Sequence, residues 1–187
     1  MTRVIAGTAG GRTLRTPPGS GTRPTSDRVR EALFSALEAR DVVRGARVLD
    51  LYAGSGALGI EAASRGAADV VCVESNRRAA HVVADNIERL GLTGATVAPR
   101  SVGAFLADGP DTPASVDLAL LDPPYDLGED ELGEALARLA DDWLARGALV
   151  VVERSSRSPE PSWPQRLPRL GRPRRYGETT LWWAERT

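Results

Sequence analysis

The stretch DLYAGSGALG, residues 50–59, decides the fold of this chain. It begins within the predicted strand at 46–52, and its glycines Gly54, Gly56 and Gly59 have the spacing G-x-G-x-x-G. Glycines at a strand-to-helix turn allow a tight bend and bring backbone N–H groups close to a ligand. The next apolar run ends in Glu74, twenty residues after Gly54, where a carboxylate can accept both ribose hydroxyls. Together these features predict an adenosine-containing ligand.

The ligand class remains open between two cofactors at this point. A nicotinamide or flavin dinucleotide would use the loop for its pyrophosphate. S-adenosylmethionine has no phosphate; the loop would then accommodate its amino-acid part, and Asp50 could meet the ammonium group. The acid four residues before the glycine-rich core, in the pattern D-x-x-x-G-S-G, favours S-adenosylmethionine.

Short apolar runs alternate with helical patterns on both sides of this loop. We expect strands at 46–52, 69–74, 95–100, 116–122 and 147–153, and helices at 57–66, 76–91, 102–107 and 129–145. Fully apolar strands that alternate with helices are typical of a parallel sheet covered on both faces. A further helix is expected from Ser26, capped by Ser26 or Thr25, and 174–186 predicts a closing strand after a turn at Gly177.

A second motif, LLDPPYD at 120–126, ends one of these strands. Neither Pro123 nor Pro124 can donate to a sheet, so the strand must stop at Asp122. In a doubly wound sheet this point lies beside the glycine loop. Asp122 and a proline carbonyl could accept the hydrogens of an exocyclic amine on a nucleobase, while Tyr125 offers a ring face for the unpaired base. The motif therefore indicates methyl transfer to an amino nitrogen.

Composition excludes several other kinds of chemistry. The 187 residues include one cysteine and one histidine, and the 24 basic residues are all arginine. No lysine is available for a P-loop or a Schiff base, and we expect no metal site. No apolar run approaches the roughly 20 residues of a membrane span, so we expect a cytoplasmic protein without membrane contact. Arginines gather near both ends of the chain, which favours a polyanionic partner.

The sequence resembles the RsmD family of class I S-adenosylmethionine-dependent methyltransferases. The resemblance rests on RPTSDRVREALFSAL (23–37), LDLYAGSGALGIEAASRGA (49–67), VESN (73–76), LLDPPY (120–125) and the AGGRTL segment near the start. It implies methylation of the N2 amine of one guanine in 16S ribosomal RNA, within a small-subunit assembly. It also implies a Rossmann-like α/β fold with a seven-stranded, mostly parallel sheet and an antiparallel C-terminal hairpin. We expect a small N-terminal β-hairpin extension (1–24), a methyltransferase domain (25–187) and a monomer.

The resemblance also implies the site residues. The predicted catalytic residues are Asp122, Pro123, Pro124 and Tyr125. The cofactor is surrounded by Asp50, Tyr52, Gly54, Ser55, Gly56, Glu74, Ser75 and Asn76, with Ser101 and the backbone of Val102 near the adenine, where such enzymes usually carry Asp or Asn. The RNA is expected to meet Arg3, Arg12, Arg15, Arg23, Thr25, Arg28 and Arg30, although Arg28 could pair with Glu31 instead.

Two other functions stay open from sequence. One is methylation of a different amino nitrogen, such as adenine N6 in DNA or a protein glutamine. The other is a non-catalytic RNA-binding module. Glutamine-specific relatives prefer Asn at the position of Asp122, and DNA enzymes usually carry a recognition domain, neither of which is present here. A dehydrogenase remains a distant possibility.

Overall fold

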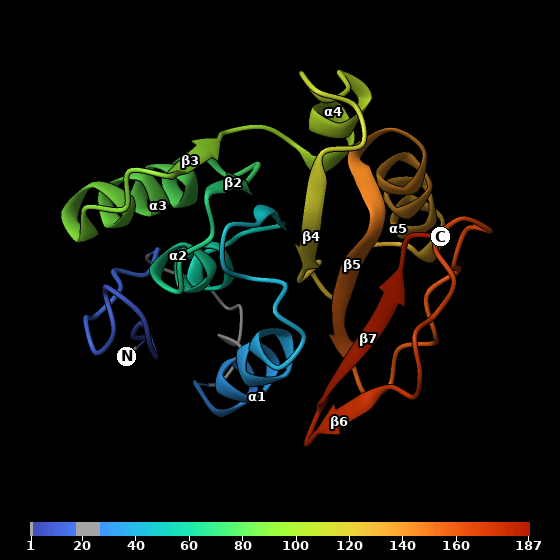
Figure 1. The fold of residues 1–187 in the computed structure, drawn as a ribbon, viewed down its shortest axis with the longest axis horizontal. Coiled ribbons are helices and arrows are strands. Elements are labelled where there is room, and N and C mark those ends of the chain that lie inside the picture. The colour runs from blue at the N-terminus through green and yellow to red at the C-terminus, as the bar shows by residue number, and fades with distance from the viewer. Residues whose placement is uncertain (1, 18–26) are drawn as a thin grey trace.

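The computed structural model describes residues 2–17 and 27–187 (Figure 1). Its centre is a seven-stranded sheet in the order β3-β2-β1-β4-β5-β7-β6, in which β1 to β5 run parallel and β7 is antiparallel to both of its neighbours. The strands are β1 Arg47–Leu51, β2 Asp69–Val73, β3 Ala95–Ala98, β4 Val116–Leu121, β5 Leu144–Ser155, β6 Arg174–Tyr176 and β7 Thr179–Glu185. The predicted doubly wound fold with an antiparallel C-terminal hairpin is confirmed.

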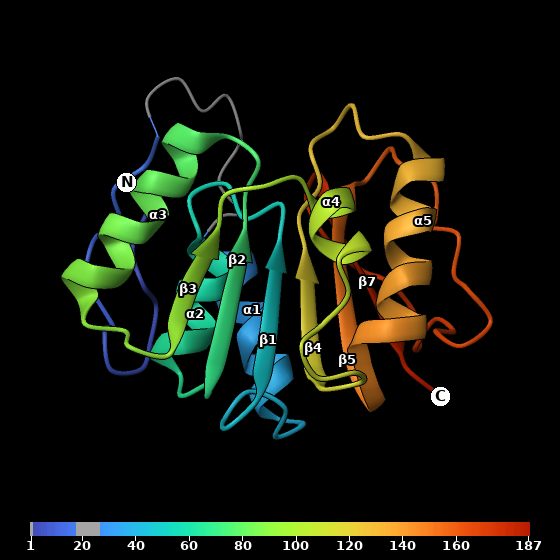
Figure 2. The same cartoon turned by 90° about the horizontal axis from the view of Figure 1, so that it is seen from above.

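Helices cover both faces of the sheet, as the apolar strands require. Seen from above, α1 (Asp27–Glu38), α2 (Ala57–Ser64) and α3 (Arg77–Leu90) lie on one face, and α4 (Val102–Ala107) and α5 (Glu129–Arg138) lie on the other (Figure 2). Each face has its own cluster of buried apolar side chains. No helix within residues 2–17 and 27–187 is long and apolar enough to cross a bilayer.

The strand order reverses between β1 and β4. From β1 the sheet continues through β2 to β3 on one side, and from β4 through β5 on the other. Ligands of open α/β sheets bind outside the carboxyl ends of the strands at such a reversal. The glycine loop follows β1 and the DPPY segment follows β4, so the fold brings the two motifs to one place.

The helix predicted at 129–145 is shorter in the structure. The α-helix α5 ends at Arg138, a π-helical turn η1 (Leu139–Trp143) follows, and β5 already begins at Leu144, three residues earlier than predicted. The turn buries Leu139 and Trp143, and the Trp143 indole Nε1 donates to the carbonyl of Leu106 at 3.2 Å. Helical spacing alone did not reveal this change of winding, because the apolar residues continue through it.

The N-terminal segment forms the predicted hairpin-like turn. The Val4 N–H donates to the Arg12 carbonyl at 2.9 Å, and the Gly11 N–H donates to the Val4 carbonyl at 2.8 Å. Val4, Ala9 and Leu14 are buried in the same apolar cluster as α1 and α2. The extension therefore shares the core of the sheet domain.

Buried polar side chains of α2 and α3 hold this extension in place. The fully buried Glu61 carboxylate accepts the backbone N–H groups of Ile5 at 2.7 Å and Ala6 at 3.0 Å. On α3, the Asn86 side chain bonds both the N–H and the carbonyl of Arg15, at 3.0 and 2.9 Å. These contacts provide hydrogen-bond partners for backbone groups of the extension that face the domain and would otherwise be unpaired.

Candidate active site

Glu74, immediately after β2, fixes the glycine loop. One carboxylate oxygen accepts the Gly54 N–H at 2.8 Å, and the other accepts the Asn76 N–H at 2.7 Å. A carboxylate oxygen has more than one lone pair, so Glu74 can still accept hydroxyl groups of a ligand. The acid predicted to bind a ribose therefore also positions the loop that would lie against the ligand.

The three motif glycines have different roles. Gly54 has φ +56°, and a Cβ added there would meet no atom within 4 Å, because this part of the loop faces open space. A Cβ on Gly56, at φ +74°, would lie 2.7 Å from a methyl of Val83. A Cβ on Gly59 would lie 2.5 Å from the Cys72 sulfur. Only Gly54 leaves room for a ligand, and the other two glycines allow α2 to pack closely.

Tyr52 occupies a strained backbone position between β1 and the loop. Its φ is +63°, a left-handed conformation that a bulky side chain rarely adopts. Strain of this kind persists where the surrounding structure fixes it, and it is concentrated at functional sites. Burial, and then the charge of Glu131, raises the pKa of Tyr52 to about 12, so its hydroxyl stays protonated.

Asp50 lies beneath the loop rather than in the pocket. It is 1 % exposed, and its Oδ2 accepts the Gly59 N–H at 2.7 Å. Burial raises the pKa of Asp50 to about 7. The prediction that Asp50 meets the cofactor ammonium does not fit this position, because a buried side chain that holds Gly59 shapes the loop from behind.

The DPPY segment stops β4 as predicted. The Asp122 N–H still reaches the Leu51 carbonyl at 3.3 Å, Asp122 is half-buried and Pro123 is buried. The chain then turns, and the Leu127 N–H donates to the Pro124 carbonyl at 3.0 Å. Tyr125 projects outward with 73 % of its surface exposed, although large apolar side chains are normally covered. An exposed ring beside a rigid acceptor segment is suited to stacking against a flat ligand.

A pocket of about 670 Å³ joins the two motifs. Of the predicted site residues, its walls contain Tyr52, Gly54, Glu74, Ser75, Ser101, Val102, Asp122, Pro123, Pro124 and Tyr125. The other predicted cofactor residues, Asp50, Ser55, Gly56 and Asn76, do not line it. Asn76 and Ser101 are N-caps: their side chains accept backbone N–H groups at the starts of α3 and α4. Asn76 therefore caps α3 from outside the pocket, whereas Ser101 caps α4 and also forms part of the pocket wall.

The pocket is acidic. Its described lining residues include five carboxylates and no arginine; the acids are Glu74, Asp122, Asp126, Glu131 and Glu153. Sequence reasoning missed Asp126, Leu127, Glu131 and Glu153, together with Val73. Glu153 had a usable signal, because it ends the apolar sequence run at 147–153 in the same way as Glu74 ends the run at 69–74. The surplus of negative charge favours a cationic ligand over a pyrophosphate.

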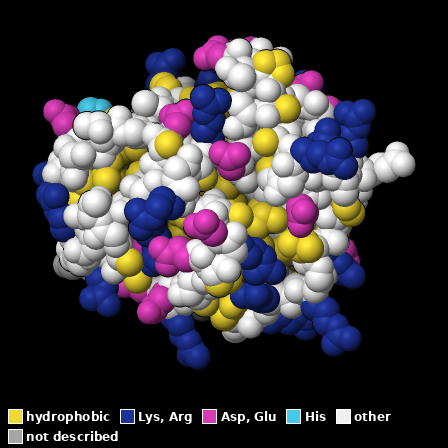
Figure 3. Space-filling view, viewed as in Figure 1, with side chains coloured by type: hydrophobic (Ala, Val, Ile, Leu, Met, Phe, Trp, Pro, Cys, Tyr) yellow, Lys and Arg dark blue, Asp and Glu magenta, His cyan; other side chains and the backbone are white. Residues whose placement is uncertain are grey.

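The arginines predicted to meet RNA fall into two groups, exposed and buried, within the described part of the chain. Arg3, Arg12, Arg15 and Arg28 are exposed, whereas Arg23 and Thr25 lie outside the described residues. Arg30 is fully buried; its Nη2 donates to the Arg3 carbonyl at 2.5 Å and to Asp27 at 3.0 Å. The prediction that Arg30 meets phosphate is therefore wrong, since its guanidinium is enclosed within the domain. Figure 3 shows basic and acidic side chains interspersed over one face of the molecule.

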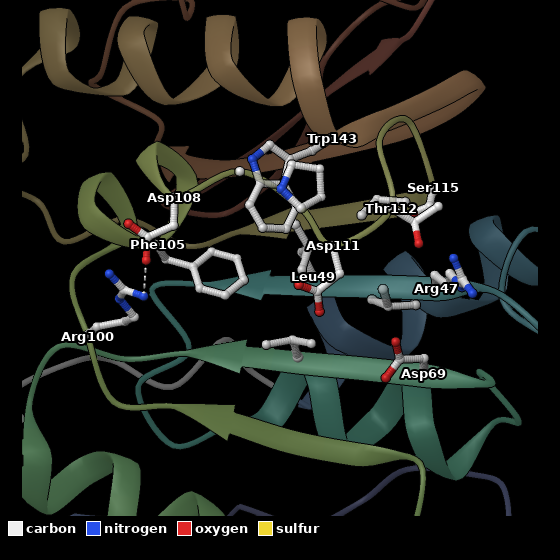
Figure 4. A pocket seen from close by; sticks show the side chains of 15 residues that line it. Arg47, Leu49, Asp69, Arg100, Phe105, Asp108, Asp111, Thr112, Ser115 and Trp143 are labelled. Atoms are coloured by element: carbon white, nitrogen blue, oxygen red, sulfur yellow. Dashed lines mark hydrogen bonds and ion pairs between the residues drawn. The ribbon is translucent and has the colours of Figure 1, made fainter.

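A second hollow, of about 530 Å³, lies over β1 and β2 on the α4 side of the sheet (Figure 4). The stacked rings of Phe105 and Trp143, 4.8 Å apart, form part of its wall, and Arg100 pairs with Asp108 at its edge. None of its lining residues belongs to the motif pocket. We therefore treat the motif pocket as the candidate active site.

Comparison with known proteins agrees with this choice. A protein-family model described as "Conserved hypothetical protein 95" matches residues 2–185. The chain belongs to this family. The Escherichia coli protein named "Ribosomal RNA small subunit methyltransferase D" is 41 % identical over 152 residues, which cover 81 % of this chain and 73 % of that protein. A Haemophilus influenzae protein of the same name is 36 % identical over 160 residues, covering 84 % and 80 %.

The solved structure of E. coli yhhF superposes on this RsmD-family chain with a TM-score of 0.85 and 36 % identity, and covers 99 % of this chain and 97 % of yhhF. The predicted membership of the RsmD family and the predicted methyltransferase fold are thus confirmed.

Proposed function

We propose that this protein is an enzyme that transfers a methyl group from S-adenosylmethionine to the N2 amine of a guanine in 16S ribosomal RNA. The observation that carries the proposal is one pocket in which the Glu74-anchored glycine loop and the Asp122–Tyr125 segment meet. Relatives that cover most of the chain are named ribosomal RNA small subunit methyltransferases, which supports the RNA substrate.

The charge of the pocket supports the cofactor. S-adenosylmethionine carries a sulfonium and an ammonium group, and five carboxylates around the pocket favour such a ligand. Glu74 would hold its ribose hydroxyls, Gly54 would allow its close approach, and Ser101 and the Val102 backbone would lie near its adenine. The cofactor supplies a methyl group on a positively charged sulfur, which leaves as a neutral thioether.

The protein's part in the reaction is positioning. The lone pair of the guanine amine is delocalised into the ring, so the amine is a weak nucleophile. Asp122 and a carbonyl of the proline pair would accept its two hydrogens, orient the lone pair towards the methyl group and stabilise the positive charge that develops on nitrogen. The methylated nitrogen would then release one of its hydrogens to water as a proton. The prolines fix these acceptors, so little reorganisation is needed. Tyr125 would stack on the base once it is unpaired.

The RNA would be held by the exposed arginines of the N-terminal extension. Arg3, Arg12 and Arg15 stand on a segment that Glu61 and Asn86 dock onto the domain. Their charge would offset the repulsion between phosphates and the acidic pocket. We propose that the protein acts as a monomer in the cytoplasm, on RNA within a small-subunit assembly.

Asp122→Ala tests the proposal. Purified wild-type protein should transfer labelled methyl from S-adenosylmethionine to guanine N2 in small subunits that lack the modification. Asp122→Ala should lower turnover at least roughly 100-fold while S-adenosylhomocysteine still binds, because Asp122 acts mainly in the transition state. Equal loss of turnover and cofactor binding, or no transfer by the wild-type protein, would contradict the proposal.

A further inference from the structure

Two carboxylates stand side by side near the carboxyl ends of neighbouring strands. Leu121 of β4 and Val152 of β5 are register partners in the parallel sheet, and Asp122 and Glu153 directly follow them. Adjacent strands lie about 4.8 Å apart, and residues in register point to the same face. Both side chains are half-buried. Glu153 is therefore the acidic neighbour of Asp122 across the sheet.

Glu153 also stands where the motif pocket meets a narrower recess. Asp122, Pro123, Tyr125 and Glu153 line both hollows. The recess measures only about 20 Å³, room for a group the size of one water molecule. It can take one polar group of a base but not a ring. The Thr179 hydroxyl, which lines the recess as well, donates to Glu153 Oε1 at 3.5 Å.

The two acids match the polar edge of guanine. Its Watson–Crick edge carries the N1–H donor directly beside the N2 amine, so two adjacent acceptors can bind it. Adenine and cytosine carry an unprotonated ring nitrogen beside their amine. A carboxylate facing that nitrogen would leave two acceptors opposed without a hydrogen, which is costly in a partly buried site.

We propose that Glu153 is a specificity-determining residue that accepts the N1–H of the target guanine while Asp122 accepts the amine. The inference rests on the proposed function and assigns the base subsite within it. Glu153 selects guanine by rejecting bases whose ring nitrogen is an acceptor. Asp122, which faces only the amine, cannot make that distinction.

A base analogue separates the two roles. 2-Aminopurine keeps the amine at C2 but has an unprotonated N1. RNA carrying guanine or 2-aminopurine at the mapped target position is assembled into subunits and compared as substrate. The wild-type enzyme should strongly prefer guanine. Glu153→Gln should lower kcat/KM on guanine roughly 10- to 100-fold. It should also narrow the guanine to 2-aminopurine preference by about 10-fold or more, because the glutamine amide can donate to an unprotonated N1.

Two further variants keep the test decisive. Thr179→Val should narrow the preference for guanine over 2-aminopurine by a smaller factor than Glu153→Gln does. If Glu153→Gln is inactive on both substrates, Thr179→Val becomes the variant that tests the role of Glu153. Glu185→Gln, at the exposed far end of β7, should leave the preference unchanged. An unchanged preference in both Glu153→Gln and Thr179→Val would overturn the role of Glu153 and leave the proposed function intact. Failure of the wild-type enzyme to methylate guanine would overturn both.

Discussion

Replacing Glu61 with glutamine should loosen the N-terminal extension and destabilise the whole domain. Glu61 is 0 % exposed, and besides the N–H groups of Ile5 and Ala6 it accepts the Nε of Arg65 at 2.7 Å. The Nε of the buried Arg30 lies 3.9 Å away. A glutamine keeps the shape of the side chain but removes the charge, and it points an NH₂ group at donors that need an acceptor.

The size of the effect follows from the burial. Removing one partner of a buried ion pair costs about 3–5 kcal/mol, because the remaining charge loses its compensation. The matched control is Glu38→Gln. Glu38 pairs with the same Arg65 at 2.8 Å, but its side chain is 49 % exposed, so its loss should cost below about 1 kcal/mol. The two variants differ in the burial of the acid and share a partner.

Urea unfolding followed by circular dichroism gives the two free energies. Hydrogen exchange at Ile5 and Ala6 shows whether the extension remains docked, and in Glu61→Gln these two amides should lose protection first. Equal and small losses of stability in Glu61→Gln and Glu38→Gln would refute the reasoning. So would unchanged protection of the two amides.

Three further outcomes are expected. Burial raises the pKa of Asp50 to about 7 from an ordinary 3.8, so between these values the folded protein keeps a proton that the unfolded chain releases. The free energy of unfolding of the wild-type protein should therefore contain a contribution that falls as the pH rises from about 4 to 7. Denaturant titrations across this range should show that Asp50→Asn lacks this contribution. Gly56→Ala should lower the free energy of unfolding by roughly 2–4 kcal/mol, because of its positive φ and the contact with Val83. Gly54→Ala has open space at its Cβ and should lower the free energy of unfolding by only about 1–2 kcal/mol. It should nevertheless weaken cofactor binding, as measured by calorimetry. Tyr125→Ala should reduce kcat/KM for RNA roughly 10- to 100-fold with unchanged thermal stability, and Tyr125→Phe should retain most activity; equal loss in both would argue against stacking.

The fold could be predicted because local patterns determine most of it. Apolar runs, the glycine loop and the proline stop each constrain the chain within a few residues, and the observed strands follow them. The change from α5 to the π-turn and β5 could not be predicted this way. It depends on Trp143 reaching the Leu106 carbonyl and on Leu144 pairing with Val116, and both contacts join distant parts of the chain.

The same limit applies to the site. Spacing identified Glu74 and Asp122, because each directly follows an apolar strand. The prediction that Arg30 is exposed to RNA was wrong, because the N-terminal extension covers Arg30 in the fold. That extension is distant from Arg30 in sequence, so the pattern of its own helix could not reveal the contact. Asp50 adjoins the motif in sequence, but a strand residue that points under the loop cannot also point into the pocket. Such roles depend on the direction of a side chain and on its burial by segments distant in sequence, and local residue spacing predicts neither.

The central claim is that this protein methylates the N2 amine of a guanine in 16S ribosomal RNA. The most direct test is a nucleotide-resolution map of modified ribosomal RNA from the source organism with and without the gene. The account predicts that one guanine loses its N2-methyl group, and that wild-type protein restores it on isolated small subunits while Asp122→Ala does not. A map in which every N2-methylguanine persists, or in which the missing methyl group belongs to another base, would contradict it.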